Sequence, residues 1–418
     1  MRRVREHALL IFALAGAVVI VHLLDDAFID GPRGVSTWSN LATDAVPMAV
    51  MVVAVVAFAF LPSAVRAWLA FVVGALLVAD GGLHIAHIVK NGGPGGSDLT
   101  GLLAGAAGVV LLGLAIVLVT RPKAPRRPLP RWGARLAVVV GIIATAFLII
   151  QPLGGAMYIV HKQPVHVQDS KLPIPHENVT FDSTDGLRLA GWYVPSKNGA
   201  AVIVLHGSGG DRSGGPRSRI LMLARHGFGV LAYDARGSGD SEGRPENIGW
   251  TWHRDIEGAV SYLRSRGITK IGGLGLSSGA EAMVDTAGRD PRIKAVVAEG
   301  TQGRTVPDTL DLPNGFTKAE LLAYFPLMYT ATQALTRAPQ PPSLKNQVAK
   351  IAPRPLFLIS SGTSYERDAN RVFYRAAGEP KTLWEMPNAS HTGGLAAYPR
   401  AYERRVVAFF NRALLGNR

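Results

Sequence analysis

The 418 residues suffice for two domains with separate cores, and 48% apolar against 18% charged residues is typical of a chain that lies partly in lipid. The absence of cysteine excludes a disulfide framework, a thiolate metal site and a cysteine nucleophile. The net charge of +14 fits an anionic membrane surface, and we expect no nucleic-acid partner because no Lys/Arg block is interleaved with aromatic residues in the second half.

Long uncharged stretches fill the first 160 residues and are absent afterwards. A helix needs roughly 20 apolar residues to cross a bilayer, and the first of these stretches is at the short end of that range. The stretches cover residues 8–24, 41–61, 68–89, 99–120 and 134–160. Asp25 and Asp26 make a poor signal-peptide cleavage site, so we expect the first stretch to be retained. The sequence therefore predicts a multi-pass, all-α transmembrane domain of about five helices over residues 1–160.

Basic residues between the stretches predict the orientation of the helices. Arg2, Arg3 and Arg5 precede the first stretch, and six more Lys or Arg residues lie within residues 121–135. Cytoplasmic loops are enriched in Lys and Arg, so we expect the N-terminus and this connection in the cytoplasm. Five spans would then carry the C-terminal domain to the extracytoplasmic side of the cell membrane.

Several polar side chains within these stretches are costly to bury in lipid. Asp80, His84 and His87 share one helical face by their i, i+3 and i, i+4 spacing, and His22 belongs to the first stretch. Hydrogen bonding between helices is the simpler interpretation, so we predict no metal. The alternative is a metal or proton-relay site built from His84, His87, Asp80 and His22.

The second half alternates between short β-branched runs and amphipathic segments, which predicts a mostly parallel sheet flanked by helices. A proline-containing linker is expected at 161–177 and the domain itself at 178–418. Strands are predicted at 178–183, 187–194, 201–205, 229–233, 270–276, 293–298, 355–360 and 381–386. Helices are predicted at 217–226, 253–266, 279–288 and 401–415. The long segment around 301–352, with a helical stretch at 321–334, is interpreted as a small lid.

The pattern G-x-S-x-G marks a sharp strand-to-helix turn that exposes a nucleophilic serine, and it occurs twice here. One copy is centred on Ser241 and the other on Ser277. Ser277 directly follows a predicted strand and precedes a helix-forming run, whereas Ser241 lies in a loop several residues past its strand. We therefore predict Ser277 as the nucleophile.

A serine hydroxyl needs an imidazole to remove its proton and a third group to orient that imidazole. With this motif the partners follow in the order Ser, acid, His. His391 is the only histidine after Ser277 and lies in a polar loop, so we predict it as the base. The acid is expected after the strand at 355–360, where we favour Glu366 over the alternative Asp368.

Acyl transfer also needs N–H groups directed at the developing oxyanion. The residue after the nucleophile, Ser278, is expected to supply one backbone N–H. The glycine-rich turn at 206–210 is expected to supply the other, through Ser208. His206 is assigned a structural role in that turn.

Four motifs together give the second half a resemblance to a known family. They are H-G-S-G-G at 206–210, D-A-R-G-S-G-D-S-E-G at 234–243, G-L-S-S-G at 275–279, and His391 in its late loop. In order and spacing these motifs resemble those of α/β-hydrolases of the serine aminopeptidase and prolyl-oligopeptidase-like esterase branch, over about residues 178–415. The resemblance implies the α/β-hydrolase fold, hydrolytic activity, and a structural role for Asp234 and Ser241.

The chain departs from that family's pattern in two places. The acid loop of such enzymes usually begins His-Gly and carries Asp, whereas here Ser361 and Gly362 precede Glu366. After the nucleophile, Ser278-Gly279-Ala280 stands where a bulkier residue and paired glycines are common.

The predicted function is a membrane-anchored serine hydrolase that cleaves carboxylic esters through an acyl-enzyme and needs no cofactor. A small-molecule or lipid ester near the bilayer is the expected substrate. Two alternatives stay open: a membrane-bound serine peptidase, which shares all the catalytic residues, and an inert sensor or scaffold, which the irregular acid loop favours.

Overall fold

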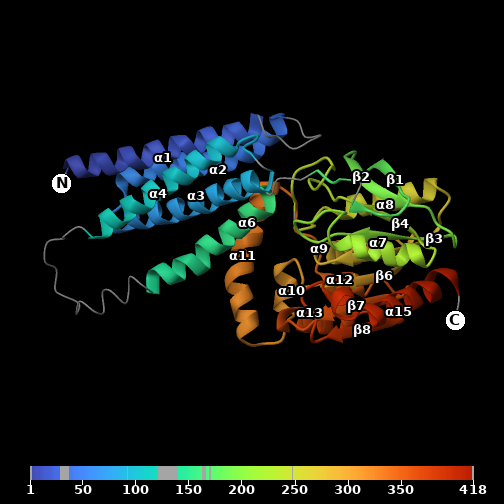
Figure 1. Cartoon of the computed structure of the whole chain (residues 1–418). Helices are drawn as coiled ribbons and strands as arrows, with labels where there is room; N and C mark the ends of the chain where they lie inside the picture. Colours follow the sequence, from blue (N-terminus) through green and yellow to red (C-terminus); the bar gives the residue numbers. More distant parts are fainter. Residues whose placement is uncertain are drawn as a thin grey trace. The chain divides into compact units, whose positions relative to one another are not determined.

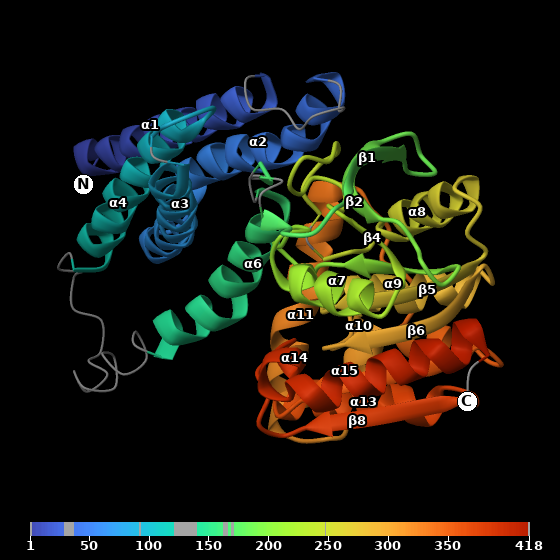
Figure 2. The same ribbon diagram turned by 45° about the vertical axis from the view of Figure 1, so that its right-hand side comes forward.

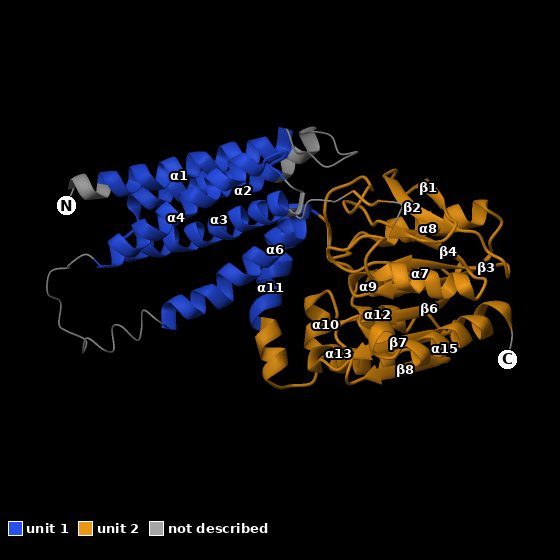
Figure 3. Ribbon diagram, in the orientation of Figure 1, with its two compact units in different colours: residues 1–31, 35–160, 323–337 blue, residues 32–34, 161–322, 338–418 orange. Residues whose placement is uncertain are grey.

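The computed structural model describes residues 2–28, 37–91, 93–120, 140–161, 166–168, 171–246 and 248–416. The chain divides into two compact units (Figure 3). One comprises residues 1–31, 35–160 and 323–337, and the other comprises residues 32–34, 161–322 and 338–418. Residues 323–337, part of the segment around 301–352 that is interpreted as a lid, group with the N-terminal helices.

Apolar helices make up the first unit (Figure 1). They are α1 (Arg2–Phe28), α2 (Thr37–Phe60), α3 (Ser63–Asn91), α4 (Asp98–Thr120), and η1 (Ala146–Ile150) running into α6 (Gln151–His161). Among the described residues, four helical segments are long and apolar enough to cross a membrane: Glu6–Phe28, Ser63–Val89, Asp98–Thr120 and Val140–Val160. Asp44–Phe60, within the predicted stretch 41–61, is a shorter apolar helix. Residues 134–139 of the predicted fifth stretch lie outside the described residues.

Glycines bring α3 and α4 into backbone contact. A Cβ added at Gly74 would lie 2.8 Å from the carbonyl oxygen of Gly108, and one at Gly81 would lie 2.8 Å from Cα of Gly105. Any larger residue at these positions would separate the two helices. Close approach through small residues is how helices associate in lipid, where apolar burial gives little driving force.

An eight-stranded sheet forms the centre of the second unit, in the order β1-β2-β4-β3-β5-β6-β7-β8. β2 is antiparallel to both β1 and β4, and the remaining pairs are parallel. The strands are β1 (Glu177–Asp182), β2 (Arg188–Val194), β3 (Ala200–Leu205), β4 (Gly229–Tyr233), β5 (Lys270–Leu276), β6 (Ile293–Glu299), β7 (Leu356–Ser361) and β8 (Lys381–Met386). Each begins and ends within one residue of its predicted bounds, so the predicted fold class is confirmed.

Helices cover both faces of this sheet (Figure 2). One face packs on α7 (Gly215–Arg225), α15 (Pro399–Phe410) and η3 (Asn411–Leu415), and the other on α8 (His253–Ser265), α9 (Ser278–Arg289), α12 (Leu344–Val348) and α13 (Ser364–Ala376). β3 is apolar throughout because both of its faces are buried. Its alternate residues Ala201, Ile203 and Leu205 enter one core, while Val202 and Val204 enter the other.

The segment between β6 and β7 is helical. It contains α10 (Val306–Leu310), α11 (Phe316–Thr336) and α12. Within the first unit, α11 lies against α6. A Cβ added at Gly155 of α6 would stand 2.3 Å from the Tyr324 hydroxyl of α11. The interpretation of this segment as a lid remains a prediction.

Candidate active site

Ser277 lies at the sharp turn between β5 and α9, with φ +53° and ψ −124°. This backbone conformation is strained for a residue with a side chain, so the surroundings must hold it in place. Both flanking glycines are required sterically. A Cβ on Gly275 would lie 2.3 Å from the Gly279 carbonyl oxygen, and one on Gly279 would lie 2.2 Å from the His206 carbonyl oxygen. The second copy of the motif has no such strand-to-helix turn.

The structure brings Ser277, His391 and Glu366 together. Oγ of Ser277 is 2.9 Å from Nε2 of His391, and Nδ1 of His391 is 2.7 Å from Oε2 of Glu366. A carboxylate only accepts hydrogen bonds, so Nδ1 carries the proton and Nε2 is left to accept one from the serine hydroxyl. This arrangement can deprotonate Ser277.

Glu366 is fixed by its neighbours. Its carboxylate accepts hydrogen bonds from the backbone N–H of Ser361, at 2.5 Å, and from the Ser361 hydroxyl, at 2.8 Å, and its side chain is fully buried. It lies in the first turn of α13, a helix that sequence analysis did not predict. The alternative acid, Asp368, is 30% exposed and lies 3.6 Å from Arg367. The geometry therefore favours Glu366.

The hydrogen bond to Glu366 raises the pKa of His391 above its ordinary value, against the lowering effect of partial burial. The charges of Glu281 and Glu299 act in the same direction. A base with a raised pKa is a stronger proton acceptor, but it is neutral over a narrower pH range.

The predicted oxyanion donors belong to two turns that lie next to Ser277. Ser278 is the first residue of α9, so its N–H has no acceptor within the helix and lies at the positive end of the helix dipole. A Cβ on Gly207 would stand 2.8 Å from Cβ of Ser277, so the turn that carries Ser208 lies against the nucleophile. The two backbone N–H groups remain our predicted oxyanion donors.

Two other residues that resemble catalytic groups have structural contacts. Nε2 of His206 accepts a hydrogen bond from the Ala235 N–H at 3.0 Å. The Ser241 hydroxyl donates to the Asp234 carbonyl oxygen at 2.6 Å and accepts from the Ala190 N–H at 2.9 Å. Both side chains are buried, and these bonds join loops to the sheet.

Known proteins share this architecture. The profile of the alpha/beta hydrolase family matches residues 202–405. The uncharacterized protein Rv2307c of Mycobacterium tuberculosis is 30% identical over 237 residues, which are 54% of this chain and 76% of that protein. The chain belongs to the α/β-hydrolase family. The uncharacterized protein YfhR of Escherichia coli K12 is 28% identical to this hydrolase over 258 residues, 58% of this chain and 83% of that protein.

Among solved structures, the esterase Pf2001 of Pyrococcus furiosus is similar to the hydrolase with a TM-score of 0.49 and 22% sequence identity. The similarity covers 60% of this chain and 98% of the esterase. Both this similarity and those to the two sequence relatives leave a large part of the chain unmatched.

Sequence analysis missed a buried clamp beside the site of this α/β hydrolase. The carboxylate of Glu299, at the end of β6, accepts hydrogen bonds from Arg219, the Tyr402 hydroxyl and the Gly394 N–H. Its backbone oxygen accepts the N–H of Ser277 at 2.8 Å. Arg219 also donates to the carbonyl oxygen of Thr392, next to His391. The clamp thus ties the nucleophile turn to the histidine loop. In the sequence, the signal for this clamp is the acidic residue Glu299 at the end of a largely apolar strand.

Glu281, one helical turn after Ser277, is a second buried acid that sequence analysis missed. Its carboxylate accepts hydrogen bonds from the backbone N–H groups of Gln302 and Gly303, at 2.9 and 3.1 Å. Burial outweighs these bonds and raises the pKa of Glu281 to about 7. The group therefore changes charge near neutral pH, within the electrostatic influence of His391.

We expect Glu281→Gln to reduce the loss of stability with rising pH. Because the folded state raises the pKa of Glu281, its contribution is complete below the ordinary pKa and is lost as pH rises through about 7. The wild-type protein should lose up to about 3 kcal/mol more than the variant between about pH 4 and pH 8. Thermal unfolding of the full chain in detergent at both pH values measures the difference. Glu320→Gln, which changes an exposed carboxylate on α11, is the control. If stability depends on pH equally in the wild type and both variants, the folded state does not raise the pKa of Glu281.

Proposed function

We propose that this α/β hydrolase is a membrane-anchored serine esterase that cleaves carboxylic esters through Ser277, His391 and Glu366. The observation that carries the proposal is the pair of short contacts that link the Ser277 hydroxyl to His391 and His391 to a buried carboxylate. The strained turn at Ser277 supports it further, because such strain is typical of a nucleophile held ready for attack.

In the acylation step, Oγ of Ser277 attacks the ester carbonyl carbon while Nε2 of His391 takes the hydroxyl proton. The carbonyl oxygen becomes an oxyanion and accepts hydrogen bonds from the N–H groups of Ser278 and Ser208. Glu366 stabilises the imidazolium without taking its proton. The C–O bond to the leaving alcohol then breaks, and Nε2 donates its proton to that alcohol.

Deacylation repeats these steps with water. Nε2 of His391 removes a proton from the water molecule, whose oxygen attacks the acyl carbon bound to Ser277. Collapse of the second oxyanion breaks the bond to Oγ, and the proton returns to Ser277. The products are a carboxylic acid and the regenerated hydroxyl, so side chains and water suffice and the proposal requires no cofactor.

Membrane anchoring is part of the proposal. Four apolar helices long enough to span a bilayer among the described residues support it, together with the basic residues at 2–5 and 121–135. With α2 as a fifth span, the hydrolase domain faces the extracytoplasmic side. Residues 323–337, inserted between β6 and β7 yet grouped with these helices, favour a substrate taken from the membrane region, such as a lipid ester.

Substrate comparison tests this function. The full chain in detergent should hydrolyse p-nitrophenyl acyl esters in preference to aminoacyl p-nitroanilides. A preference for the anilides would replace the esterase with the peptidase. Failure to hydrolyse either class, together with no labelling by a fluorophosphonate, would leave the inert scaffold.

A further inference from the structure

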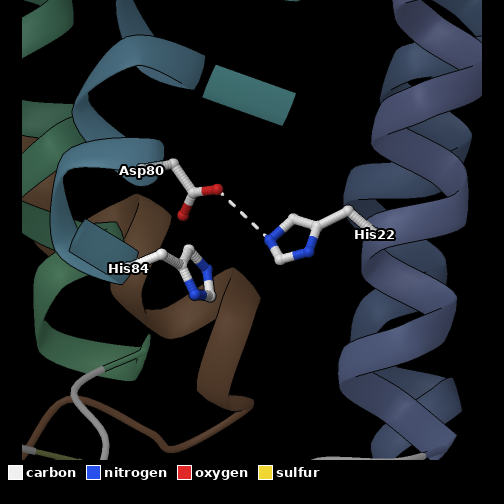
Figure 4. A group of neighbouring side chains, drawn as sticks. All are labelled: His22, Asp80 and His84. Atoms are coloured by element: carbon white, nitrogen blue, oxygen red, sulfur yellow. Dashed lines mark ion pairs between the residues drawn. The ribbon is translucent and has the colours of Figure 1, made fainter. Parts of the chain in front are cut away.

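The first unit holds a cluster of imidazoles and carboxylates that the proposed esterase does not use. Figure 4 shows Asp80 and His84, both from α3, beside His22 from α1. One ligand atom from each of these three residues lies within 4.8 Å of the other two. His22 is 4% exposed, Asp80 7% and His84 9%, in helices apolar enough to lie in lipid. Retaining such groups there is costly and indicates a function.

We infer that His22, Asp80 and His84 bind a divalent transition-metal ion, with Zn²⁺ the best match to the ligands. Two imidazoles and a carboxylate suit zinc, whereas Mg²⁺ and Ca²⁺ prefer oxygen ligands alone. Bonds of about 2.0–2.2 Å in tetrahedral geometry place ligand atoms about 3.3–3.6 Å apart. Nε2 of His22 lies 3.2 Å from Oδ2 of Asp80, so this pair is close to the required separation. A ligand atom of His84 lies within 4.8 Å of both, so the imidazole must move closer to bind the same ion.

The other nitrogen of each imidazole is held by a hydrogen-bond partner. Nδ1 of His84 lies 3.0 Å from the carboxylate of Asp98, and Nδ1 of His22 lies 3.0 Å from the Thr100 hydroxyl. Thr100 in turn donates to Asp25 at 2.6 Å. Hydrogen bonds of this kind orient the histidines of known metal sites and leave Nε2 to bind the ion. The arrangement therefore resembles a metal site with its supporting partners in place.

The space for the His84 ring depends on a glycine in α4. A Cβ on Gly101 would lie 2.4 Å from Nε2 of His84 and 2.1 Å from the neighbouring ring carbon. Only glycine at this position leaves room for the His84 ring in the orientation in which Nε2 is left to bind an ion.

Asp26 is the candidate fourth ligand, although its carboxylate lies outside the set of atoms that are mutually within 4.8 Å. One of its carboxylate oxygens lies 3.7 Å from Nε2 of His22. The other, Oδ1, is buried and has no hydrogen-bond partner among the described residues. An unpaired buried carboxylate oxygen is costly, and a cation would offset that cost. His87, part of the site as predicted from the sequence, instead bonds Asp98 at 2.8 Å and is a supporting residue.

An ion bound here would cross-link α1 to α3, with α4 joined through Asp98 and Thr100. The site lies in the helical unit, and its ion would bind whether or not the hydrolase domain cleaves esters.

Metal analysis of the full chain, purified in detergent with a tag free of histidine, tests the inference. The wild type should retain about one zinc ion per chain after dialysis, and Asp80→Asn and His84→Ala less than a tenth of that. His226→Ala is the matched control, because His226 is an exposed histidine bonded to Glu403. Asp98→Asn should weaken zinc binding by about 10–100-fold through the orientation of His84. A wild type that takes up no zinc when offered it, or equal zinc in Asp80→Asn and the wild type, would overturn the site.

If His84→Ala does not fold, Asp80→Asn keeps the shape of the side chain and carries the comparison. Zinc should then raise the thermal unfolding temperature of the wild type, because an ion that binds only the folded state stabilises it. The same addition should leave Asp80→Asn unchanged. A zinc-dependent rise of the same size in both proteins would also reject the site.

Discussion

Replacement of Ser277 by alanine is expected to lower kcat/KM for ester hydrolysis by about 10⁴- to 10⁶-fold. The variant loses the only atom that forms the covalent bond to the acyl group, while His391, Glu366 and the oxyanion donors stay in place. Residual hydrolysis would come from water oriented at those groups. Steady-state rates with a p-nitrophenyl ester, measured on the full chain in detergent, give the comparison.

Labelling with a fluorophosphonate checks the same assignment independently of the substrate. The wild type should be labelled and Ser277→Ala should not. Ser261→Ala, which removes an exposed hydroxyl on α8, should be labelled like the wild type. Labelling that persists in Ser277→Ala would mean that another serine is the nucleophile.

The order of elements in the hydrolase domain could be predicted because local patterns determine it. Central strands such as β3 are apolar on both faces, and glycine-rich turns separate them from helices. The nucleophile could be separated from the decoy Ser241 for a similar reason. Gly275 and Gly279 are required by the strand-to-helix turn at Ser277, and that turn is visible in the sequence as a strand followed by a helix-forming run.

α13 was predictable in principle but was not predicted. Its buried residues Ala369, Val372 and Phe373 follow helical spacing. The N-terminal part of this helix, which contains Glu366 and Asp368, was interpreted instead as the acid loop of the family. Recognition of the helix would have separated Glu366 from Asp368, because residues two positions apart in a helix point in different directions.

Contacts between residues far apart in the chain could not be predicted. Arg219 and Glu299 are 80 positions apart, and no periodic pattern links them. The polar cluster in the helical unit could be predicted in its members, which the alternative metal site names, but not in its pairings. Spacing grouped Asp80 with His84 and His87, but both histidines bond Asp98 of the next helix, while Asp80 pairs with His22. Such pairings depend on how helices pack, which sequence spacing within one helix does not determine.

Replacement of Glu366 by glutamine is expected to lower kcat/KM by about 10³- to 10⁴-fold at neutral pH. Glutamine is close to glutamate in size, and its carbonyl oxygen can still accept from Ser361. It lacks the charge that stabilises the imidazolium and no longer fixes which nitrogen of His391 carries the proton. The pH dependence of the residual activity distinguishes this electrostatic role from a loss of folding.

The direction of the pH shift follows from the pKa of His391. The bond to Glu366 raises that pKa, and only the neutral imidazole can act as the base, so loss of the carboxylate charge extends activity to lower pH. The acid limb of kcat/KM should therefore move down in Glu366→Gln, although the charge of Glu299 still favours the imidazolium. Asp368→Asn is the matched control and should change neither the rate nor the acid limb. A large loss of rate in Asp368→Asn, with Glu366→Gln active, would transfer the role of the acid to Asp368. If the acid limb of Glu366→Gln lies at the same pH as that of the wild type, Glu366 does not raise the pKa of His391.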